Sequence, residues 1–226
     1  MARLVAREVT KTFGRNGATV TAVERASLEV DRGDFVAITG HSGSGKTTLL
    51  SMLGGLSRPS TGRVLFEGDD LYRRDGDALS AYRSAHVGFV FQFASLLGAL
   101  TVKENLLLPT RFHPSRRGAD ALDARARELL EIVGVGEKAD AYPAQLSGGQ
   151  QRRVAIARAF MNEPQLILAD EPTGDLDEET EAEVMKLFRA MNERSGTAVV
   201  LVTHDLELAR QASRRARMHR GVLEFV

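Results

Sequence analysis

A glycine-rich run at residues 40–47 has the residue types and spacing that hold phosphate groups. It follows an apolar run at 35–39 and precedes another at 49–53, which predicts a loop between a strand and a helix. Glycines let backbone N–H groups turn inward, Lys46 can reach the β- and γ-phosphates, and the Thr47 hydroxyl can ligate Mg²⁺. A glycine-rich turn kept for packing alone is the alternative. The residues expected to bind the phosphates and their surroundings are Gly40, His41, Ser42, Gly43, Ser44, Gly45, Lys46, Thr47 and Thr48.

Two adjacent carboxylates, Asp170 and Glu171, follow the apolar run at 166–169. A buried strand there would deliver both acids to the C-terminal edge of a parallel sheet, where ligands of open α/β sheets bind. Successive strand residues point to opposite sides, so the two acids should have different roles. We expect Asp170 to hold Mg²⁺ through water and Glu171 to polarise the attacking water. The alternative is a strand that ends at a charged surface.

A second serine- and glycine-rich turn, at residues 146–150, precedes a helical stretch at 151–158. A helix start with a serine cap and available backbone N–H groups is a second anion site. Because residues 40–47 already provide one phosphate cradle, we expect this second site to close over a nucleotide held by another copy of the chain. The residues expected to take part are Ser147, Gly148, Gly149 and Gln150.

The elements that must position these residues follow an α/β pattern. Short apolar runs suit strands that are covered on both faces, as in parallel sheets. They occur at residues 35–39, 87–91, 166–169 and 198–202. Residues 1–32 alternate more and predict antiparallel strands, and residues 218–226 predict a final hairpin around Arg220 and Gly221. The basic run at 214–220 is expected to be a solvated helix face, with contact to anionic lipid headgroups as the alternative.

Helical periodicity marks residues 120–133 and 178–194, and the capping-box pattern from Thr101 to Glu104 predicts a helix start. We therefore expect one α/β domain: a P-loop NTPase core with a parallel sheet, an N-terminal antiparallel β subdomain and an inserted α-helical subdomain. The core and the β subdomain are expected at 1–99 and 163–226, and the helical subdomain, with the second anion site, at 100–162.

Composition narrows the classes of function. The 226 residues include 30 Lys and Arg, 30 Asp and Glu, and no cysteine. Balanced charge argues against a nucleic-acid partner, and the lack of cysteine removes disulfides and thiol catalysis. Charge begins at Arg3, too early for a secretory signal, so we expect a cytoplasmic location. The uncharged interval between Arg83 and Lys103 is long enough to cross a bilayer, but its glycines and polar residues favour a buried strand followed by a loop.

The run Leu146-Ser147-Gly148-Gly149-Gln150 gives the sequence its clearest family character. With it, the sequence resembles the ABC ATPase family over essentially the whole chain. In that family this run is the signature motif, and two subunits pack head to tail with two ATP molecules between them. The resemblance implies an ATPase that uses ATP and Mg²⁺, forms a homodimer on ATP binding, and works an integral membrane permease subunit from the inner face of the membrane.

The resemblance also assigns roles to single residues. Gln92 matches the Q-loop glutamine, which contacts the metal or water and reports to the membrane subunit. Asp177 matches the D-loop aspartate that works across the dimer, His204 matches the switch histidine at the γ-phosphate, and Phe13 stands where an aromatic ring stacks on adenine. Taken singly, these can equally be structural residues, but their order along the chain supports the assignment. The expected catalytic residues are Lys46, Gln92, Glu171 and His204, and the expected metal ligands are Thr47, Gln92 and Asp170.

Residues 17–28, 91–105 and 171–174 resemble the lipoprotein-releasing and macrolide-exporter ATPases within that family. This resemblance implies export, lipoprotein release or mechanotransmission, and no residue here is expected to touch the transported substance. One alternative is an ATP-dependent regulator of a membrane protein, of the cell-wall-hydrolase or division type. ABC ATPases that act on ribosomes or DNA usually carry fused second cassettes or long insertions, and this sequence has neither.

Overall fold

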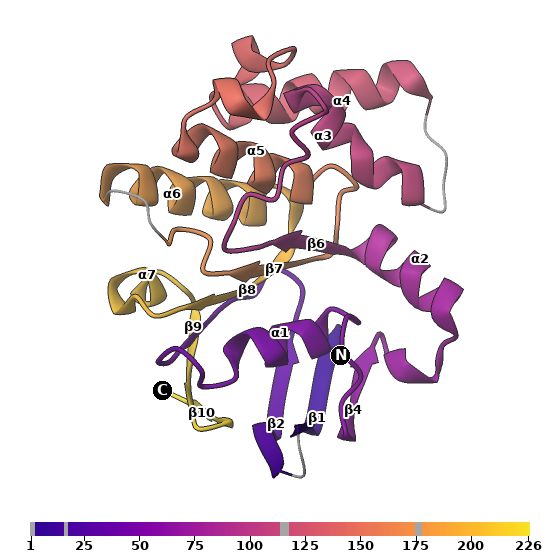
Figure 1. The fold of residues 1–226 in the computed structure, drawn as a ribbon, viewed down its shortest axis with the longest axis vertical. Helices are drawn as coiled ribbons and strands as arrows, with labels where there is room; N and C mark the ends of the chain where they lie inside the picture. The colour runs from indigo at the N-terminus through magenta and orange to yellow at the C-terminus, as the bar shows by residue number, and fades with distance from the viewer. Residues whose placement is uncertain (1–2, 16–17, 114–117, 175–177) are drawn as a thin grey trace. The chain divides into compact units, whose positions relative to one another are not determined.

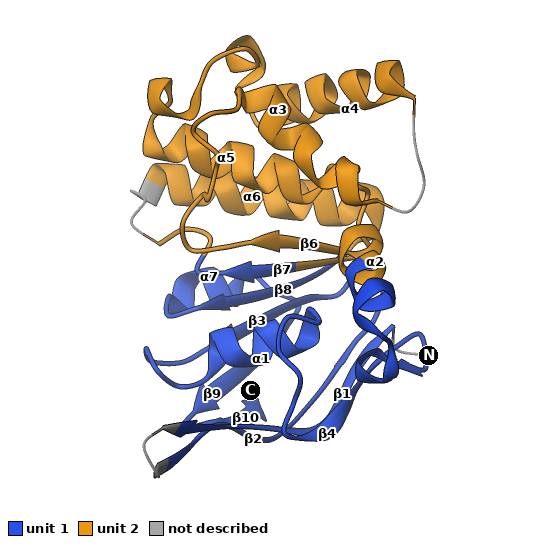
Figure 2. Ribbon diagram, turned by 45° about the vertical axis from the view of Figure 1, so that its right-hand side comes forward, with its two compact units in different colours: residues 1–80, 168–171, 198–226 blue, residues 81–167, 172–197 orange. Residues whose placement is uncertain are grey.

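The structure is a computed structural model that describes residues 3–15, 18–113, 118–174 and 178–226. The chain forms two compact units (Figure 2). The first unit comprises Met1–Ser80, Leu168–Glu171 and Ala198–Val226, and the second comprises Ala81–Ile167 and Pro172–Thr197. These limits differ from the subdomains expected at 1–99 with 163–226 and at 100–162, which stay a prediction.

An antiparallel sheet forms the N-terminal part of the first unit, as the alternation in residues 1–32 predicts. It contains β1 Leu4–Arg15, β2 Ala18–Val30, β4 Thr61–Phe66 and β5 Asp69–Asp70, in the order β2-β1-β4-β5. Figure 1 shows β2, β1 and β4 side by side. The β1–β2 register shifts between Ala6 and Val9, where Glu8 has a φ of 44°. This bulge moves the buried face from even to odd positions, so Ala6 and Val9 are both buried.

A largely parallel sheet forms the rest of the first unit and positions the candidate site. β3 Phe35–Thr39 pairs in parallel with β8 Ala198–Thr203 on one side and with β9 Arg214–His219 on the other. The order continues from β8 to β7 Leu166–Asp170, whose last residues belong to this unit. Every residue of β3 and β8 is buried, which explains their continuous apolar sequence. The helices α1 Lys46–Leu53 and α7 Leu206–Arg210 belong to this unit, as does the 3₁₀ turn η1 Leu71–Arg73.

The basic run at 214–220 is a strand for most of its length, so the expectation of a helix face is wrong. In β9 the side chains of Ala216 and Met218 are buried, whereas Arg215 and Arg217 are exposed. This alternation has the period of a strand, and the number of arginines hid it. The predicted final hairpin is confirmed: β9 pairs antiparallel with β10 Val222–Phe225 across a turn with positive φ at Arg220 and Gly221.

The second unit is mainly helical. It contains β6 Val87–Val90, α3 Val102–Leu107, η2 Leu108–Phe112, α4 Ala119–Ile132, η3 Gly136–Lys138, η4 Pro143–Gln145, α5 Gly148–Ala159 and α6 Glu178–Ser195. The helix α2 Gly76–His86 begins in the first unit and ends in the second. Thr101 caps α3, with the Glu104 N–H donating to the Thr101 Oγ1 at 3.2 Å and the Thr101 N–H to the Glu104 carboxylate at 2.8 Å. The predicted capping box is therefore confirmed.

The uncharged interval between Arg83 and Lys103 contains the end of α2, β6 and the loop that leads to α3. Within the residues that the structure describes, no helix is long and apolar enough to cross a membrane. The expected strand and loop in this interval are confirmed.

Candidate functional site

The glycine-rich loop connects β3 to α1 and so lies at the C-terminal end of the parallel strands. Gly45 stands immediately before α1 with a φ of 105°, and a Cβ at this position would collide with the backbone carbonyl of Ala22. Only glycine fits there. In α1, all of which the structure describes, no side chain caps the first turn and no acid lies in it. The backbone N–H groups at this helix start can therefore bind an anion.

Lys46 lies inside this loop and is only 7% exposed. Its Nζ donates hydrogen bonds to the carbonyl oxygens of Gly40 at 2.7 Å and His41 at 3.2 Å. Ser44 is buried beside it, and its Oγ has no hydrogen-bond partner within the described part of the chain. A buried hydroxyl without a partner is costly unless a ligand engages it. The loop thus presents a lysine and an available hydroxyl together.

The Asp170 carboxylate and the Thr47 hydroxyl are neighbouring oxygen groups, and both could serve as metal ligands. The Asp170 carboxylate is hydrogen-bonded to the Thr47 side chain. Burial raises the pKa of Asp170 above its ordinary value; the Thr47 hydrogen bond opposes this rise, the charge of Glu171 adds to it, and the charge of Lys46 opposes it. A divalent cation at this carboxylate would favour its charged form.

Glu171 lies one residue past the end of β7 and has a φ of 46°, so it leaves the strand geometry. Its backbone N–H donates to the Val202 carbonyl at 2.9 Å, which fixes it beside β8. Its Oε1 lies 3.6 Å from the Lys46 Nζ, and its Oε2 lies 2.9 Å from the His204 Nδ1. Asp170 and Glu171 therefore have different hydrogen-bond partners, and Glu171 reaches His204 through a left-handed turn.

His204 follows β8 directly and keeps its side chain 72% exposed. The next residue, Asp205, caps α7 by accepting hydrogen bonds from the N–H groups of Glu207 at 2.7 Å and Leu208 at 3.1 Å. The Asp205 N–H donates to the Thr203 Oγ1 at 3.0 Å. His204 is therefore held between a buried strand end and a capped helix start.

The serine- and glycine-rich turn at 146–150 lies at the start of α5, as predicted. The Gln150 N–H donates to the Ser147 Oγ at 3.2 Å, and the Ser147 N–H donates to the Gln150 Oε1 at 2.9 Å. Ser147 and Gly148 are exposed, and a Cβ on Gly148 would meet nothing within 4 Å. The turn is thus formed, open and able to receive an oxyanion.

The remaining predicted site residues are Gln92, Phe13 and Asp177, which come from separate segments of the chain. Gln92 is exposed in the segment that follows β6, in the second unit with the turn at 146–150. Phe13 on β1 is 47% exposed, and the Lys11 Nζ lies 5.3 Å from its ring centroid. The first unit holds Phe13, residues 40–48, Asp170, Glu171 and His204. Asp177 lies outside the described residues.

Sequence reasoning missed two arginines of α5, Arg152 and Arg158, which bind backbone carbonyls near Gln92. Arg152 is only 6% exposed. The one signal available was the position of both arginines on the helix that the signature run begins.

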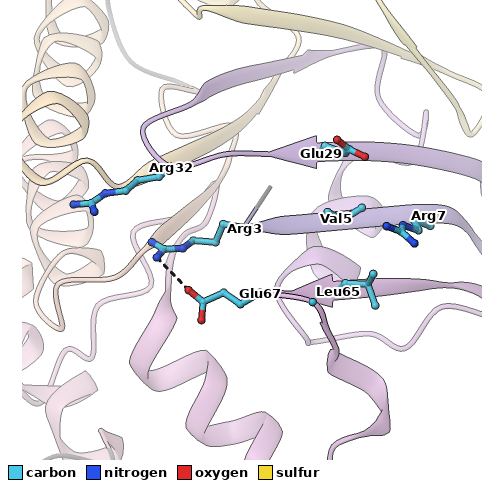
Figure 3. A pocket seen from close by; sticks show the side chains of 8 residues that line it. Arg3, Val5, Arg7, Glu29, Arg32, Leu65 and Glu67 are labelled. Carbon is cyan, nitrogen blue, oxygen red and sulfur yellow. Dashed lines mark ion pairs between the residues drawn. The ribbon is translucent and has the colours of Figure 1, made fainter. Parts of the chain in front are cut away.

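A hollow elsewhere in the first unit is not this site. It lies on the antiparallel sheet, where Arg3 and Glu67 form an ion pair of 3.1 Å (Figure 3). Its lining residues are Arg3, Val5, Arg7, Glu29, Arg32, Leu65, Glu67 and Gly68. None of them belongs to the residues expected to bind or hydrolyse a nucleotide.

Comparison with known proteins gives concordant results. A family model described as ABC transporter matches residues 23–174. The chain is 40% identical over 222 residues to LolD of Idiomarina loihiensis, named a lipoprotein-releasing system ATP-binding protein, and the match covers 98% of this chain and 96% of LolD. It is 44% identical over 222 residues to MacB of Syntrophobacter fumaroxidans, named a macrolide export ATP-binding/permease protein. That match covers 96% of this chain but only 30% of MacB.

Among solved structures, the fold resembles a dimeric post-hydrolysis state of the ATP-binding cassette MJ0796 bound to ADP and Pi. The TM-score is 0.91 at 39% sequence identity, covering 98% of this chain and 96% of that one. The predicted α/β fold, with its parallel sheet and N-terminal antiparallel strands, is confirmed by this likeness.

Proposed function

Because the chain belongs to the ABC transporter family, we propose that it binds ATP with Mg²⁺, hydrolyses the ATP and so drives a membrane permease. The observation that carries this proposal is the convergence of Lys46, Glu171 and His204 beside the β3–α1 loop. A cationic donor, a carboxylate base and an exposed imidazole at a phosphate-binding helix start are the parts that phosphoryl transfer to water requires.

The donor set fits a nucleotide bound with Mg²⁺. The Thr47 hydroxyl and the Asp170 carboxylate supply hard oxygen ligands, which Mg²⁺ prefers. Across the described residues, no group of three or more His, Cys, Asp or Glu side chains is arranged to hold a metal. This suits Mg²⁺, which takes one or two protein ligands and completes its shell with phosphate oxygens and water. When bound, it would neutralise phosphate charge during the transfer.

The chain's own groups then have separate tasks. Lys46 and the N–H groups at the start of α1 hold the phosphates, and the Ser44 hydroxyl, which has no partner among the described residues, adds a donor. Glu171 orients and activates the attacking water. His204 orients Glu171 through its Nδ1, and when its Nε2 also carries a hydrogen that N–H donates to the γ-phosphate. Gln92 contacts the metal or the water, as its position after β6 in this family implies. Phe13 stacks on the adenine ring, which its exposed ring allows.

We propose that the second half of each site comes from another copy of the chain. Ser147 and Gly148 of the turn at 146–150 are exposed, and the turn belongs to the other compact unit. MJ0796, which the fold resembles, is dimeric in its solved structures. Ser147, Gly148, Gly149 and Gln150 of one copy then bind the γ-phosphate held by Lys46 of the other, with Asp177 acting across the dimer. Loss of the γ-phosphate removes the bridge and reopens the dimer.

The proposed membrane partner is an integral permease subunit, with this chain peripheral on the cytoplasmic face, where ATP is available. The relatives are named for macrolide export and lipoprotein release, which favours transport over the regulatory alternative. The transported substance is expected to contact the permease and not this chain.

Mixed dimers test the shared site. Lys46→Ala and Ser147→Ala chains with different affinity tags should each hydrolyse ATP poorly alone, because every site in each homodimer lacks one half. A dimer purified through both tags retains one intact composite site and should recover activity. No recovery in a demonstrated mixed dimer would contradict the shared site, whereas wild-type protein without ATPase activity would contradict the function itself.

A further inference from the structure

Two arginines of α5 bind the backbone of the segment that follows β6. We call residues 91–95 the Gln92 loop. The arginines, Arg152 and Arg158, and the Gln92 loop all belong to the second compact unit. Both side chains donate to main-chain carbonyls, and both lie on the helix that begins at the signature turn. The contacts therefore connect two predicted functional segments that lie about 60 residues apart in sequence.

Arg152 makes the most extensive of these contacts. Its Nη1 donates to the carbonyl of Phe91 at 2.9 Å and also to the carbonyl of Gln92. Its Nη2 donates to the carbonyl of Gly174 at 3.1 Å. Gly174 lies in the segment that follows Glu171 and leads to Asp177. The planar guanidinium has donors at fixed angles, so one buried side chain can hold two separate backbone segments.

Arg158 holds the other end of the Gln92 loop. Its Nη1 donates to the Ser95 carbonyl at 2.9 Å, and its Nη2 donates to the Ala94 carbonyl at 3.0 Å. Arg158 is partly buried, and this burial lowers the pKa of its guanidinium. The two carbonyl oxygens replace part of the water that a free guanidinium would bind.

Asn105 fixes the backbone beyond the loop. It is fully buried, its Oδ1 accepts from the Leu97 N–H at 2.8 Å, and its Nδ2 donates to the carbonyls of Leu97, Leu100 and Thr101 at 3.0 to 3.2 Å. The main chain on both sides of Gln92 is thus held by side chains of α5 and α3. In contrast, the side chains of Gln92 and Phe93 are exposed. The loop therefore combines a fixed backbone with exposed side chains at Gln92 and Phe93.

We propose that Arg152 is a positioning residue that joins the signature helix, the Gln92 loop and the segment after Glu171 into one body. It lies five residues beyond Ser147, about 7.5 Å along the helix axis at 1.5 Å per residue. A displacement of Ser147 on a partner's phosphate is then passed to Gln92 and Gly174 through one guanidinium. This inference rests on the proposed function for its catalytic consequence, but the loop contact itself can be tested without ATP.

The experiment compares Arg152→Ala and Arg152→Lys with a matched control, Arg153→Ala. Arg153 is the neighbouring arginine on α5, and it forms an ion pair with Glu183 on α6 at 3.4 Å. The chain contains no tryptophan, so Phe93→Trp places a single fluorescent reporter on an exposed position of the loop. Each variant is made in this reporter background, and tryptophan anisotropy and hydrogen exchange of residues 91–97 are measured without nucleotide.

With Arg152→Ala we expect lower anisotropy and at least tenfold faster exchange in the loop, because the contacts to the Phe91 and Gln92 carbonyls are lost. Its kcat should fall about tenfold or more with the ATP Kd changed less than twofold, since misplacement of a positioned group mainly affects turnover. Arg152→Lys should recover part of the loop order and part of the kcat, because lysine keeps the positive charge but lacks the several fixed N–H donors of the guanidinium. Arg153→Ala should match wild type in every measurement.

Unchanged anisotropy and exchange in Arg152→Ala would overturn the proposal, as would equal loop effects from Arg153→Ala. If Arg152→Ala does not fold, Arg152→Lys carries the test, and a loop as ordered as wild type together with wild-type kcat would overturn the proposal. A wild-type protein that hydrolyses no ATP would contradict the proposed function but leave the anisotropy and exchange results to decide the positioning role.

Discussion

His204 contacts one carboxylate oxygen of Glu171 twice: its Nδ1 lies 2.9 Å and its backbone N–H 3.2 Å from the Oε2. An ionised carboxylate only accepts hydrogen bonds, so the Nδ1 carries the hydrogen and the Nε2 is left facing away from Glu171. The other carboxylate oxygen faces Lys46 at 3.6 Å. Glu171 is therefore oriented from both sides by groups that also belong to the phosphate site.

Glu171→Gln should separate binding from hydrolysis. The amide keeps the size of the side chain and can still accept from His204, but it cannot take a proton from water. We expect turnover to fall about 10²- to 10⁴-fold, with ATP binding retained. Gel filtration with ATP should then show an accumulated dimer. A product that stays monomeric with ATP would count against the proposed shared site, and the exposed Glu207→Gln on α7 is the control.

Lys46→Ala should lower turnover about 10²-fold or more, because it removes the cation that the loop presents to the phosphates. It also removes the donor to the Gly40 and His41 carbonyls, so a lower melting temperature is expected as well. Steady-state hydrolysis and thermal melting measure the two effects. The exposed Lys186→Ala on α6 should change neither, and full activity in Lys46→Ala would remove the phosphate-site assignment.

Asp170→Asn should stabilise the metal-free protein at neutral pH while weakening binding of ATP with Mg²⁺. Because burial raises the Asp170 pKa above its ordinary 3.8, the folded state holds that proton more tightly than the unfolded state does. This carboxyl therefore contributes stability when protonated, and the contribution is lost as pH rises through the raised folded pKa.

The asparagine variant cannot ionise, so its melting temperature should exceed that of wild type by about 2 °C near pH 7, a small shift because the group is partly solvated. The difference should shrink as pH falls toward 3.8. Melting curves in EDTA across pH measure it, with exposed Asp140→Asn as control. A melting-temperature difference that grows as pH falls would contradict the predicted direction of the Asp170 effect.

Phe13→Ala should weaken ATP binding while Phe13→Trp preserves it, because stacking on a base needs an aromatic face and contributes about 1–3 kcal/mol per base. A titration of nucleotide affinity should show at least about a fivefold rise in Kd for the alanine variant. The control is Phe225→Ala, on an exposed ring of β10. An unchanged Kd in Phe13→Ala would place adenine elsewhere.

Local patterns in the sequence predicted much of the fold. Thr101 and Glu104 form their capping box because both partners lie within one helical turn. The loop at 40–45 and the turn at 146–150 were recognised because each motif lies next to the helix that it begins. The strand β9 was missed because its arginines hid the inward positions of Ala216 and Met218.

The long-range contacts of the site were not predictable in this way. Nothing near Arg152 in sequence indicates that it would reach Gln92 or Gly174, since those carbonyls come from chain segments brought together only by folding. The left-handed φ of Glu171 was equally hidden, because glutamate rarely adopts it and only the surrounding strands impose it. The residue types of the site followed from the sequence, but the partners of each side chain did not.

Lys46 rests on two carbonyls of its own loop and is almost completely buried. Folding itself has therefore removed the hydration shell of this ammonium group, at a free-energy cost that the carbonyl contacts offset. A phosphate that arrives exchanges one set of oxygen partners for another and has no water to strip from the lysine. The side chain that binds the ligand also holds the loop in its binding conformation, so the site is preorganised before the phosphate arrives.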